Sequence, residues 1–524
     1  MFERSKLGRV SVSVALFAIA YLALCIVYLC WTWSHELGDF GGDNAFYLLM
    51  AEHFSPWTAY SPVTEYFASH NPYPPLYPLL LGFFTDGGNL LAAHLVTTAF
   101  LLVSFALLVA WQRELGIGGM VAAWVVVLFA LLRGTYMQAL ALLSENLYLL
   151  CTLVALLAVA YSERTGKDSW RWVATAAVAA AMLTRMAGLS LFIAFAAYLV
   201  LHRVRRGWLM AGVALIPLTW WSVVFQTNGS VYSSTFLERY GAESFQVVVR
   251  QITHQAGALW YGWLLNFSNS ISAGWVIGAA AIICLAGALD RVLTRKFDGL
   301  YVVTYLLMVL VWPHPSEAQR LIFVLVPVLL VQGVWWLSRT SLLHMKWRGV
   351  RIAPPVLLLI LTLVAIPELV LTVGRFYQPL PRELEVYRRD VGWYGVGMQQ
   401  GLESIAFSNA VLLNLQQARD RLPEEACLYS VKPSIAGFYS RRISKIPPPE
   451  HLDAAEFRQQ LQSSGCRYFH MISRVTPAYK ASFYPEQRLE DELRMLTEAK
   501  VRVGNREEPV ARLAEFVNHG AKLR

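Results

Sequence analysis

The sequence predicts a mainly α-helical, polytopic membrane protein of about eleven transmembrane helices, followed by a small soluble α/β domain. Hydrophobic residues make up 56% of the 524 residues and charged residues only 15%, whereas soluble domains are nearer half apolar and a quarter charged. The apolar residues gather in runs that reach the length of about 20 residues needed to cross a bilayer. They do not alternate with polar residues as in a transmembrane barrel, so the spans are expected to be helices.

The expected spans follow the apolar runs along the chain. They are residues 10–33, 89–111, 119–136, 142–161, 171–185, 188–201, 208–226, 271–290, 297–312, 320–338 and 352–374. The runs at 171–185 and 188–201 are short and are expected to form a tight hairpin that does not fully cross. The first run is too long for a cleavable signal peptide and lacks a small-residue cleavage pattern.

Lysine and arginine in the loops predict the orientation. With the N-terminus in the cytoplasm, the inner segments hold most of these residues. The outer segments before the C-terminal region hold only Arg133, Arg185, Arg239, Arg250 and Arg320. The net charge of +9 is thus spread over short loops and forms no continuous patch for nucleic acid. The compact loops favour a bacterial inner-membrane protein whose C-terminal domain lies in the periplasm.

Two domains are expected, a transmembrane domain over 1–374 and an extracytoplasmic α/β domain over 375–524. Two long outer loops, 34–88 and 227–270, are candidates for handling substrate, and the first holds no Lys or Arg. In the C-terminal domain, 382–421 is expected to be helical, and "ACLYSV", "RRISKI" and "CRYFHM" read as strands. Cys427 and Cys466 each begin a strand, so a disulfide and two free thiols both remain open.

The first outer loop carries the leading candidate for chemistry. In "GDFGGDNAFYLLMAEHF" the apolar residues recur at helical spacing, which predicts a short amphipathic helix on the membrane that begins at Asp43. An N-cap role is the alternative for Asp43. Asp39 and Asp43 stand in a loop without cationic partners, just above spans that carry ionisable residues on the same side.

Those ionisable residues come from three separate spans. Glu145 falls at the outer end of the fourth, Arg185 follows the fifth, and His314, Glu317 and Arg320 lie at the outer mouth of the tenth. Ionisable groups in hydrocarbon are costly and usually functional, and several at one depth indicate a polar cavity that opens outward. Snorkelling of single residues and a structural salt bridge between Glu145 and Arg185 are the alternatives.

Such a cavity suits sugar transfer from a lipid phosphate. Arginine binds phosphate through bidentate, charge-assisted hydrogen bonds, and a carboxylate beside an acceptor hydroxyl or amine can take its proton. We therefore expect Asp43 to act as the base and arginines to stabilise the departing phosphate. A single in-line displacement would invert the anomeric centre, and apolar span surfaces would hold the polyprenyl tail.

Several motifs resemble the GT-C superfamily, in particular protein O-mannosyltransferase-like enzymes and lipid A aminoarabinose transferases. "GGDNAFYLLMAEHF" resembles their first outer loop, in which an Asp is followed four residues later by a Tyr, here Asp43 and Tyr47. "NPYPPLYPLLLGFF", which contains Tyr77, resembles their proline-rich re-entry segment. "LLSENLYLL" is similar to their fourth-span motif with its Glu, here Glu145.

The resemblance covers nearly the whole chain, with the motifs in the same order. "LTRMAGLSLF" is similar to a Thr-Arg-Pro-type motif and holds Arg185, and "AQRLIFVLVPVLL" is similar to an Arg-Tyr-Leu-Leu-Pro-type stretch and holds Arg320. "SVKPSIAGFYSRRISKIPP" resembles the start of the outer domain. The resemblance implies that Asp43 is the catalytic base and Arg320 a phosphate ligand. Together with the polar cavity inferred above, we expect Arg185 at the phosphate site and Tyr47, Tyr77, Glu145, His314 and Glu317 in the substrate pocket.

Three positions depart from the family pattern. Met186 stands where Pro is common, Leu321 replaces Tyr, and Asn44 follows Asp43 where Asp-Glu is frequent. The loss of the second carboxylate argues against a two-carboxylate metal site, so metal-independent transfer without a cofactor is expected. The donor would be a polyprenyl-phosphate sugar and the acceptor a lipid, glycan or protein.

Two other classes of function stay open at this stage. A transporter also places charges in spans, but transporters often show repeated halves and sites at mid-membrane, and neither is evident in the sequence. A polysaccharide ligase or polymerase with diphosphate-linked donors would place its key arginines in a large middle loop, where Arg239 and Arg250 lie.

Overall fold

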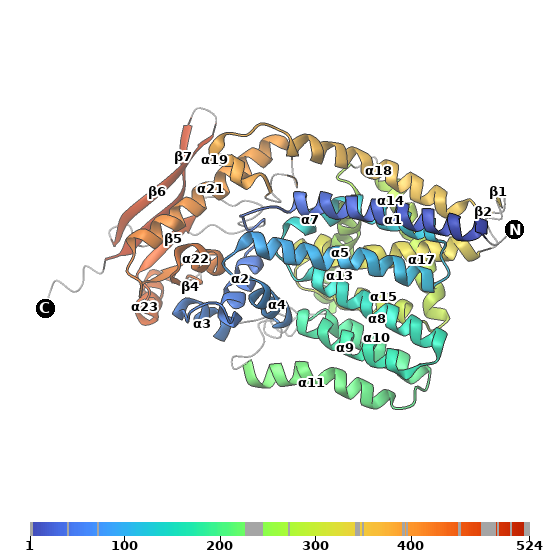
Figure 1. The fold of residues 1–524 in the computed structure, drawn as a ribbon. Coiled ribbons are helices and arrows are strands. Elements are labelled where there is room, and N and C mark those ends of the chain that lie inside the picture. The colour runs from blue at the N-terminus through green and yellow to red at the C-terminus, as the bar shows by residue number, and fades with distance from the viewer. Residues whose placement is uncertain are drawn as a thin grey trace.

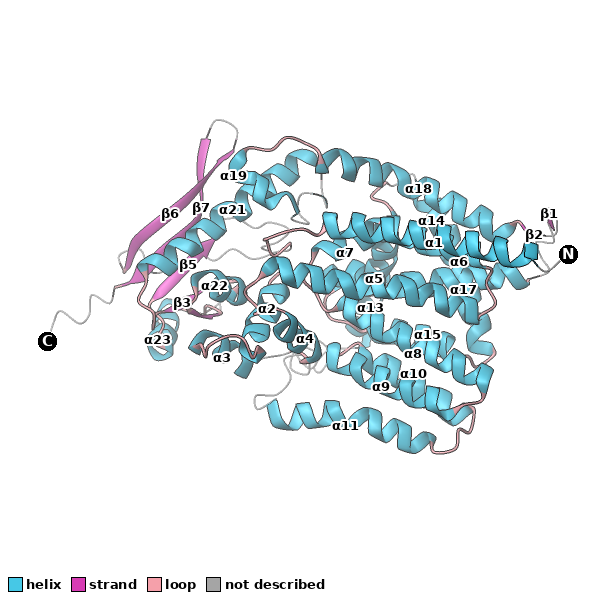
Figure 2. Ribbon diagram, viewed as in Figure 1, coloured by secondary structure: helices cyan, strands magenta, loops and turns pink. Residues whose placement is uncertain are grey.

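The computed structural model describes residues 4–38, 41–70, 73–225, 245–270, 273–340, 346–347, 350–389, 394, 397–448, 452–472, 489, 492–503 and 506–517. The chain forms a bundle of long helices and a smaller α/β domain at one end of the bundle (Figure 1). Helices dominate, and the strands that form the main sheet all belong to the smaller domain (Figure 2). Helix α1 begins at the end of the bundle remote from that domain (Figure 1).

Each apolar segment expected from the sequence coincides with a helix or a pair of helices. They are α1 (Arg4–Trp31), α5 (Leu90–Glu114), α6 (Gly119–Leu131) with α7 (Arg133–Leu140), α8 (Glu145–Thr165), α9 (Asp168–Thr184), α10 (Gly188–Leu201), α11 (Gly207–Phe225), α14 (Gly274–Leu293), α15 (Phe297–Leu310), α16 (Ala318–Phe323) with α17 (Leu325–Arg339), and α18 (Ala353–Phe376). Helices α9 and α10 are joined by only three residues, as a tight hairpin requires.

Length and composition separate these helices into classes. Within the described part of the chain, the four helices α5, α8, α14 and α18 are long and apolar enough to cross a membrane, and six spans result if each bent pair is counted. Shorter apolar helices cover Ala18–Trp31, Gly188–Leu201, Gly207–Val223 and Phe297–Leu310. The number of about eleven spans therefore stays a prediction.

Both bent pairs lie near the end of the bundle that faces the smaller domain. Helices α6 and α7 meet at 59°, and the segment Pro315–Phe323 meets α17 at 54°. Pro327 in the first turn of α17 has no N–H to donate to the carbonyl of Phe323, which explains why the helix does not continue straight through this point. The second bend turns Arg320 away from the line of α17.

The predicted helix of the first outer loop is present, with two further helices after it. They are α2 (Asp43–Phe54), α3 (Pro62–Ser69) and α4 (Leu76–Phe84), and α13 (Phe245–Phe267) belongs to the second long loop. The expectation that the first of them buries only one apolar face is wrong, and its place on the membrane stays a prediction. Tyr47, Leu48, Leu49 and Met50 are all buried, because α4 and the smaller domain pack on different sides of this helix.

The smaller domain confirms the three predicted strands. Its elements are α19 (Arg382–Glu385), α21 (Met398–Arg421), β3 (Cys427–Tyr429), α22 (Pro433–Ser440), β4 (Ile443–Lys445), α23 (Ala454–Ser464), β5 (Tyr468–Ile472), β6 (Leu493–Val503) and β7 (Arg506–Phe516). The sheet order is β4-β3-β5-β7-β6, with β3 parallel to both neighbours and β7 antiparallel to both of its own. The long β6–β7 pair was not predicted.

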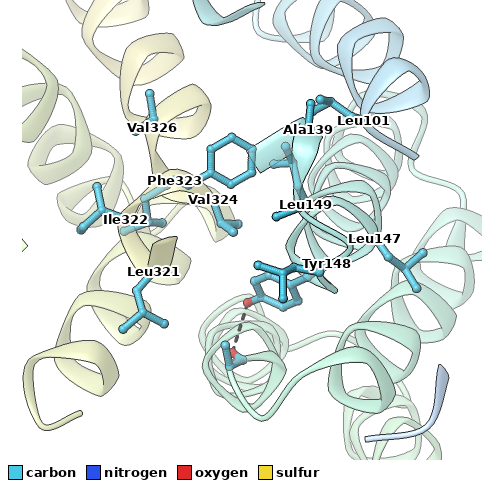
Figure 3. Packing of buried hydrophobic residues seen from close by; sticks show 14 of the residues in the cluster. Leu101, Ala139, Leu147, Tyr148, Leu149, Leu321, Ile322, Phe323, Val324 and Val326 are labelled. Carbon is cyan, nitrogen blue, oxygen red and sulfur yellow. Dashed lines mark hydrogen bonds between the residues drawn. The ribbon is translucent and has the colours of Figure 1, made fainter. Parts of the chain in front are cut away.

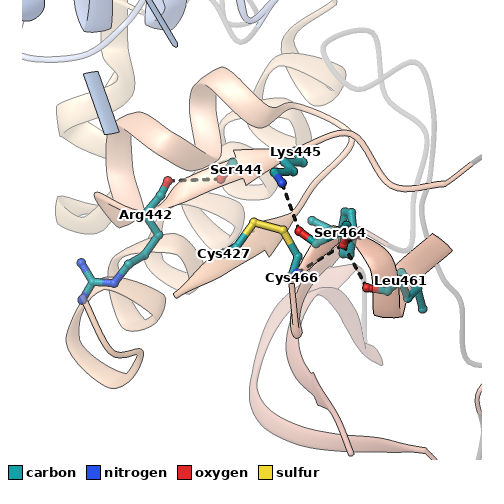
Figure 4. Close-up of a disulfide and its surroundings, with 8 residues drawn as sticks. Cys427, Arg442, Ser444, Lys445, Leu461, Ser464 and Cys466 are labelled. Atoms are coloured by element: carbon teal, nitrogen blue, oxygen red, sulfur yellow. Dashed lines mark hydrogen bonds between the residues drawn. A yellow bond between two sulfur atoms is a disulfide. The ribbon is translucent and has the colours of Figure 1, made fainter. Parts of the chain in front are cut away.

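Cys427 and Cys466 form a disulfide (Figure 4), which resolves the alternative left open by the sequence. The bond joins the start of β3 to the turn before β5, with the two Cα atoms 4.6 Å apart. The other four cysteines are free thiols, and Cys151 and Cys284 are buried among the helices. The disulfide therefore links the two neighbouring parallel strands β3 and β5 at one point.

The smaller domain docks on the first outer loop. Ser434 at the start of α22 donates a hydrogen bond to the carbonyl of Gly42 (2.7 Å), and the ammonium of Lys432 donates to the carbonyl of Gly41 (2.8 Å). Arg441 forms an ion pair of 2.5 Å with Glu52 on α2. The helix that begins at Asp43 is thus held from outside the membrane domain.

The apolar core runs through the bundle and up to the bent pairs. Figure 3 shows Phe323 and Val324, at the bend between α16 and α17, facing Leu149 of α8 and Ala139 of α7. All four side chains are at most 1% exposed. This packing fixes the bend, and with it the direction in which Arg320 leaves α16.

Candidate active site

An open cavity lies where the helix ends nearest the smaller domain meet residues of the 34–88 loop, with an empty volume of about 830 Å³. Its walls come from four stretches far apart in the sequence: α2, the segment before α4, the α9–α10 turn, and the chain from the end of α15 to α16. The lining residues are Asp43, Tyr47, Tyr73, Pro74, Arg185, Met186, Ala187, Met308, Trp312, His314, Glu317, Arg320 and Leu321.

Asp43 sits in this wall with both carboxylate oxygens engaged. Its Oδ1 accepts a hydrogen bond from the Tyr73 hydroxyl (2.8 Å), and its Oδ2 accepts one from a terminal nitrogen of Arg320 (2.7 Å). The side chain makes no capping bond to its own helix, because Gly42 occupies the N-cap position. The structure therefore rejects the N-cap alternative and places Asp43 between a phenol and a guanidinium group.

Glu145 lies behind the cavity wall and joins the two arginines. Its Oε1 pairs with Arg320 and with Arg185, while the Glu145 side chain has no exposed surface. Its Oε2 is buried and has no hydrogen-bond partner within the described residues. Arg185 also donates to the hydroxyl of Ser144 (3.4 Å), which Tyr47 contacts at 3.1 Å. Two carboxylates and two guanidinium groups thus form one neutral network.

This network keeps Asp43 charged. Burial alone would raise the pKa of the Asp43 carboxyl, but the attraction of Arg320, its hydrogen bond and the Tyr73 hydroxyl outweigh it and hold the pKa below its usual value. Burial raises the pKa of Tyr47 to about 12, so this phenol stays protonated at neutral pH. Asp43 is an anion that hydrogen-bond donors hold in position.

The local backbone explains why Asp43 reaches this place. Gly42 has a φ of 104°, a conformation that side chains other than glycine strongly disfavour, and it turns the chain into α2. Helix α4 then packs so closely on α2 that a Cβ on Gly82 would lie 2.3 Å from the carbonyl oxygen of Ala51. The left-handed turn at Gly42 sets the start of α2, and close packing at Ala51 fixes the later part of the helix against α4.

The structure brings most of the predicted site residues together. Asp43, Tyr47, Arg185, His314, Glu317 and Arg320 all line the cavity. The Glu317 carboxylate accepts a hydrogen bond from the Trp312 indole (3.1 Å). Two predicted pocket residues do not line it: Glu145 is enclosed beneath the arginines, and Tyr77 is completely buried.

Tyr77 has a structural position instead. Its hydroxyl bonds to Thr97 on α5 (2.9 Å), and its ring packs edge-on against Tyr47 with centroids 5.0 Å apart. The first turn of α4 directs this side chain toward α5 and away from the cavity. Tyr77 therefore supports Tyr47 from behind and does not reach a ligand.

Two residues of the site were missed from the sequence, Tyr73 and Trp312. Tyr73 lies in the same "NPYPPLYP" segment as Tyr77, and the motif contains nothing that tells which tyrosine faces the cavity. Trp312 ends a run of apolar residues and looks like an ordinary interfacial aromatic. Asp39 and Arg239 lie outside the described residues, whereas Arg250 is exposed on α13 and is not among the cavity residues.

No sequence family matches the chain, and no curated protein matches it either. Solved structures do match. ArnT from Cupriavidus metallidurans in the apo state is 14% identical, the match covers 96% of this chain and 98% of that one, and the TM-score is 0.52. The same protein bound to undecaprenyl phosphate gives 14% identity, 97% and 98% coverage, and a TM-score of 0.51.

The likeness to ArnT extends over nearly the full length of both chains. The chain has the GT-C fold. An oligosaccharyltransferase from Archaeoglobus fulgidus also matches, at 11% identity over 86% of this chain and 69% of that one, with a TM-score of 0.47. The GT-C fold and the apolar helices make the chain an integral membrane protein.

Metal ligands are sparse in this GT-C cavity. Within the described residues, no group of three or more His, Cys, Asp or Glu side chains is placed to hold a metal ion. Asp43 and Glu145, the two carboxylates nearest the arginines, are already paired with guanidinium groups. The donor set therefore suits an anion that competes for the arginines better than a cation that competes for the carboxylates.

Proposed function

We propose that this protein is an inverting glycosyltransferase, which moves a monosaccharide from a polyprenyl-phosphate donor to a lipid, glycan or protein acceptor at the outer membrane face. The observation that carries the proposal is the ion pair of 2.7 Å between Asp43 and Arg320 in an open cavity, with Arg185 beside it. The proposed base, Asp43, is therefore in direct contact with Arg320, the proposed phosphate ligand. The solved structure of ArnT with undecaprenyl phosphate supports a lipid phosphate as the ligand class.

The donor phosphate first replaces Asp43 on Arg320. Arg320 and Arg185 each have a partly exposed side chain, 22% and 11%, so their guanidinium groups are accessible from the cavity. A phosphate with two oxygens directed at them forms charge-assisted hydrogen bonds of the strongest class. Asp43 is then released from the charge that holds its pKa low, and it becomes a better base.

Transfer then needs one displacement. The acceptor hydroxyl or amine attacks the anomeric carbon, the bond from that carbon to the phosphate oxygen breaks, and its electron pair stays on the phosphate. The acceptor proton goes to Asp43, whose Oδ1 keeps the hydrogen bond from Tyr73. Arg320 and Arg185 stabilise the charge that develops on the leaving phosphate. Attack from the face opposite the phosphate inverts the anomeric centre.

The outer face is supported by two independent features. The lysine and arginine distribution puts the α/β domain outside, and the same domain contains the Cys427–Cys466 disulfide, a bond that persists in oxidising compartments. The α/β domain docks on α2 next to Asp43, so the cavity lies on the same side. A bacterial inner membrane with the domain in the periplasm fits these features.

The test is donor consumption. Purified protein in detergent is incubated with a panel of polyprenyl-monophosphate sugars and an envelope extract as the source of acceptor, and loss of sugar from the lipid is followed by mass spectrometry. We expect wild type to consume one donor and Asp43→Asn to fold, bind that donor and leave it intact. Near-normal turnover by Asp43→Asn would show that this carboxylate is not the base.

Arginine variants separate the rival classes in the same assay. Arg320→Ala is expected to weaken donor binding by roughly ten- to a hundredfold, since a charge-assisted hydrogen bond contributes about 1.5–3 kcal/mol. Arg250→Ala is the matched control, because Arg250 is exposed on α13 outside the cavity. Loss of activity with Arg250→Ala and none with Arg320→Ala would favour a diphosphate-donor ligase. Transport of a donor without its consumption would favour a carrier.

A further inference from the structure

A second cavity lies at the opposite end of the helix bundle, with an empty volume of about 900 Å³. It is lined where α5, α8, α14 and α17 end and α15 begins, and its charged residues are Glu114, Arg164, Arg291, Lys296, Asp298 and Arg339, together with Glu163. Helix α8 connects the two sites: it begins at Glu145 and ends at Thr165. Its 21 residues span about 30 Å, the thickness of a bilayer core.

Most of the charges in this second cavity are paired with one another. Arg291 and Asp298 form a buried fork whose shortest contact is 2.7 Å, Arg164 pairs with Glu114 at 2.9 Å, and Lys296 pairs with Glu163 at 2.9 Å. These three pairs use all the carboxylates of the lining. One of the four cationic side chains of the lining is not in these pairs.

Arg339 is that cation. It lies at the end of α17 with an exposed side chain, and its guanidinium group stacks on the Trp335 ring at 4.6 Å from the ring centroid. Arg291 stacks on the same ring at 4.8 Å. No carboxylate within the described residues pairs with Arg339, so a positive charge faces this cavity without a counter-charge.

One acceptor in the wall lacks a donor. The Glu114 side chain is 8% exposed, and its Oε1 pairs with Arg164. Its Oε2 is buried and has no hydrogen-bond partner within the described part of the chain. A buried carboxylate oxygen without a donor costs about 1–3 kcal/mol or more. The cavity therefore combines an unmatched cation with an unmatched acceptor.

The surroundings are those of a membrane surface. The cavity lies at the ends of three long apolar helices, α5, α8 and α14, at the end of the bundle remote from the α/β domain (Figure 1). Trp111 and Trp335 in its wall are the aromatic type that gathers at the headgroup level. Basic pockets between helices on the inner side are typical sites for lipid head groups.

We propose that this second cavity binds a phospholipid head group that carries both a phosphate and a primary ammonium, as in phosphatidylethanolamine. The phosphate pairs with Arg339, and a rotation of the Glu114 carboxylate brings its buried Oε2 to the cavity, where an ammonium N–H donates to it. A phosphatidylglycerol head group also satisfies Arg339, but its hydroxyls can give Oε2 of Glu114 only a neutral hydrogen bond, which is about half as strong as a charge-assisted one. A choline head group has the positive charge but no N–H to donate, so the site discriminates between the two zwitterionic lipids.

Native mass spectrometry of the full-length protein in detergent tests this site. Phosphatidylethanolamine, phosphatidylglycerol and phosphatidylcholine with identical acyl chains are added at equal concentration, and the retained lipid is counted. Wild type is expected to retain phosphatidylethanolamine at least roughly tenfold more than phosphatidylcholine, the lower end of what one charge-assisted hydrogen bond provides, and roughly threefold more than phosphatidylglycerol. Glu114→Gln should lose this preference, while Arg339→Gln should retain less of all three lipids.

Two controls remove a charge at the same end of the bundle but outside the cavity. They are Asp168→Asn and Arg113→Gln, both of which should retain lipid like wild type. If Glu114→Gln does not fold, Glu114→Asp replaces it and should keep a reduced preference. Equal retention of the three lipids by wild type, or an intact preference in Glu114→Gln, would overturn the proposal. Displacement of the lipid by soluble O-phosphoethanolamine would overturn its assignment as a lipid site.

Discussion

Glu145→Gln tests whether the buried network is a phosphate site or only a structural salt bridge. The change keeps the shape of the side chain and removes its charge. Glu145 has no exposed surface and pairs with both Arg185 and Arg320, so the variant leaves two guanidinium groups with Asp43 as their nearest anion. Removal of one partner from a buried ion pair typically destabilises a protein by about 3–5 kcal/mol. We expect a clearly lower melting temperature.

The informative measurement is the response to a lipid phosphate. Without Glu145 the network has a net charge of +1, and an added phosphate restores the lost partner of Arg185 and Arg320. The affinity for phosphate should therefore rise, and a tenfold increase adds about 1.4 kcal/mol of stabilisation at saturating ligand. Undecaprenyl phosphate should then raise the melting temperature of Glu145→Gln more than that of wild type.

The assay is thermal unfolding of the purified protein, followed by tryptophan fluorescence over a titration of undecaprenyl phosphate. Glu52→Gln is the control, because Glu52 pairs with Arg441 outside the cavity and both side chains are partly exposed. Such a pair contributes about 0–1 kcal/mol, so this control should shift little and respond to ligand like wild type. The phosphate site would be refuted if Glu145→Gln has a lower melting temperature than wild type and undecaprenyl phosphate raises both melting temperatures by the same amount.

The remaining predictions concern the base and its supports. Tyr73→Phe removes a hydrogen bond that favours charged Asp43, so the pKa of this carboxyl should rise and the acid limb of the pH–rate profile should move to higher pH; an unmoved limb would contradict this. The Asp43 carboxylate contributes stability that is complete above its unfolded pKa of about 3.9 and is lost as pH falls through its lower folded pKa, so wild type and Asp43→Asn should differ in melting temperature at pH 7 and converge in strong acid. Gly82→Ala should displace α2, since a Cβ there meets the Ala51 carbonyl at 2.3 Å, whereas Gly212→Ala meets open space and should be silent; equal activity of these two variants would disprove the tight α2–α4 contact. Chelation of divalent ions should leave transfer unchanged, and inhibition that a divalent ion reverses would refute metal-independent transfer.

The charged part of the site was predictable from the sequence for a physical reason. A charge in an apolar helix is so costly that it is retained only where a partner or a function compensates it. Glu145, Arg185 and Arg320 therefore stand out against their surroundings, and the predicted orientation puts them at one depth. The structure joins them in a single network with Asp43. That these residues touch one another depends on three-dimensional packing, which their spacing along the chain does not reveal.

The uncharged part was not predictable in the same way. The chain has 24 tyrosines and 18 tryptophans, and an aromatic residue near the membrane surface is ordinary, so Tyr73 and Trp312 carry no distinguishing signal. Tyr77 was assigned to the pocket because it belongs to the same motif, but the direction of its side chain depends on how α4 packs against α5. The β6–β7 pair is different. In β6 the charged residues Arg494, Glu498, Lys500 and Arg502 fall at every second position except Leu496, and this period of two was overlooked.

Once the donor is bound, the proposed transfer step leaves the net charge of the network and its phosphate unchanged. At rest, two carboxylates balance two guanidinium groups, and a donor phosphodiester adds one negative charge. When the sugar leaves, the phosphate gains a second negative charge while Asp43 takes the acceptor proton and becomes neutral. Arg320, which holds Asp43 in the free enzyme and the donor phosphate in the complex, then binds the doubly charged phosphate. A low-dielectric cavity penalises any change in net charge, so the proton transfer to Asp43 and the departure of the phosphate are expected to be coupled through Arg320.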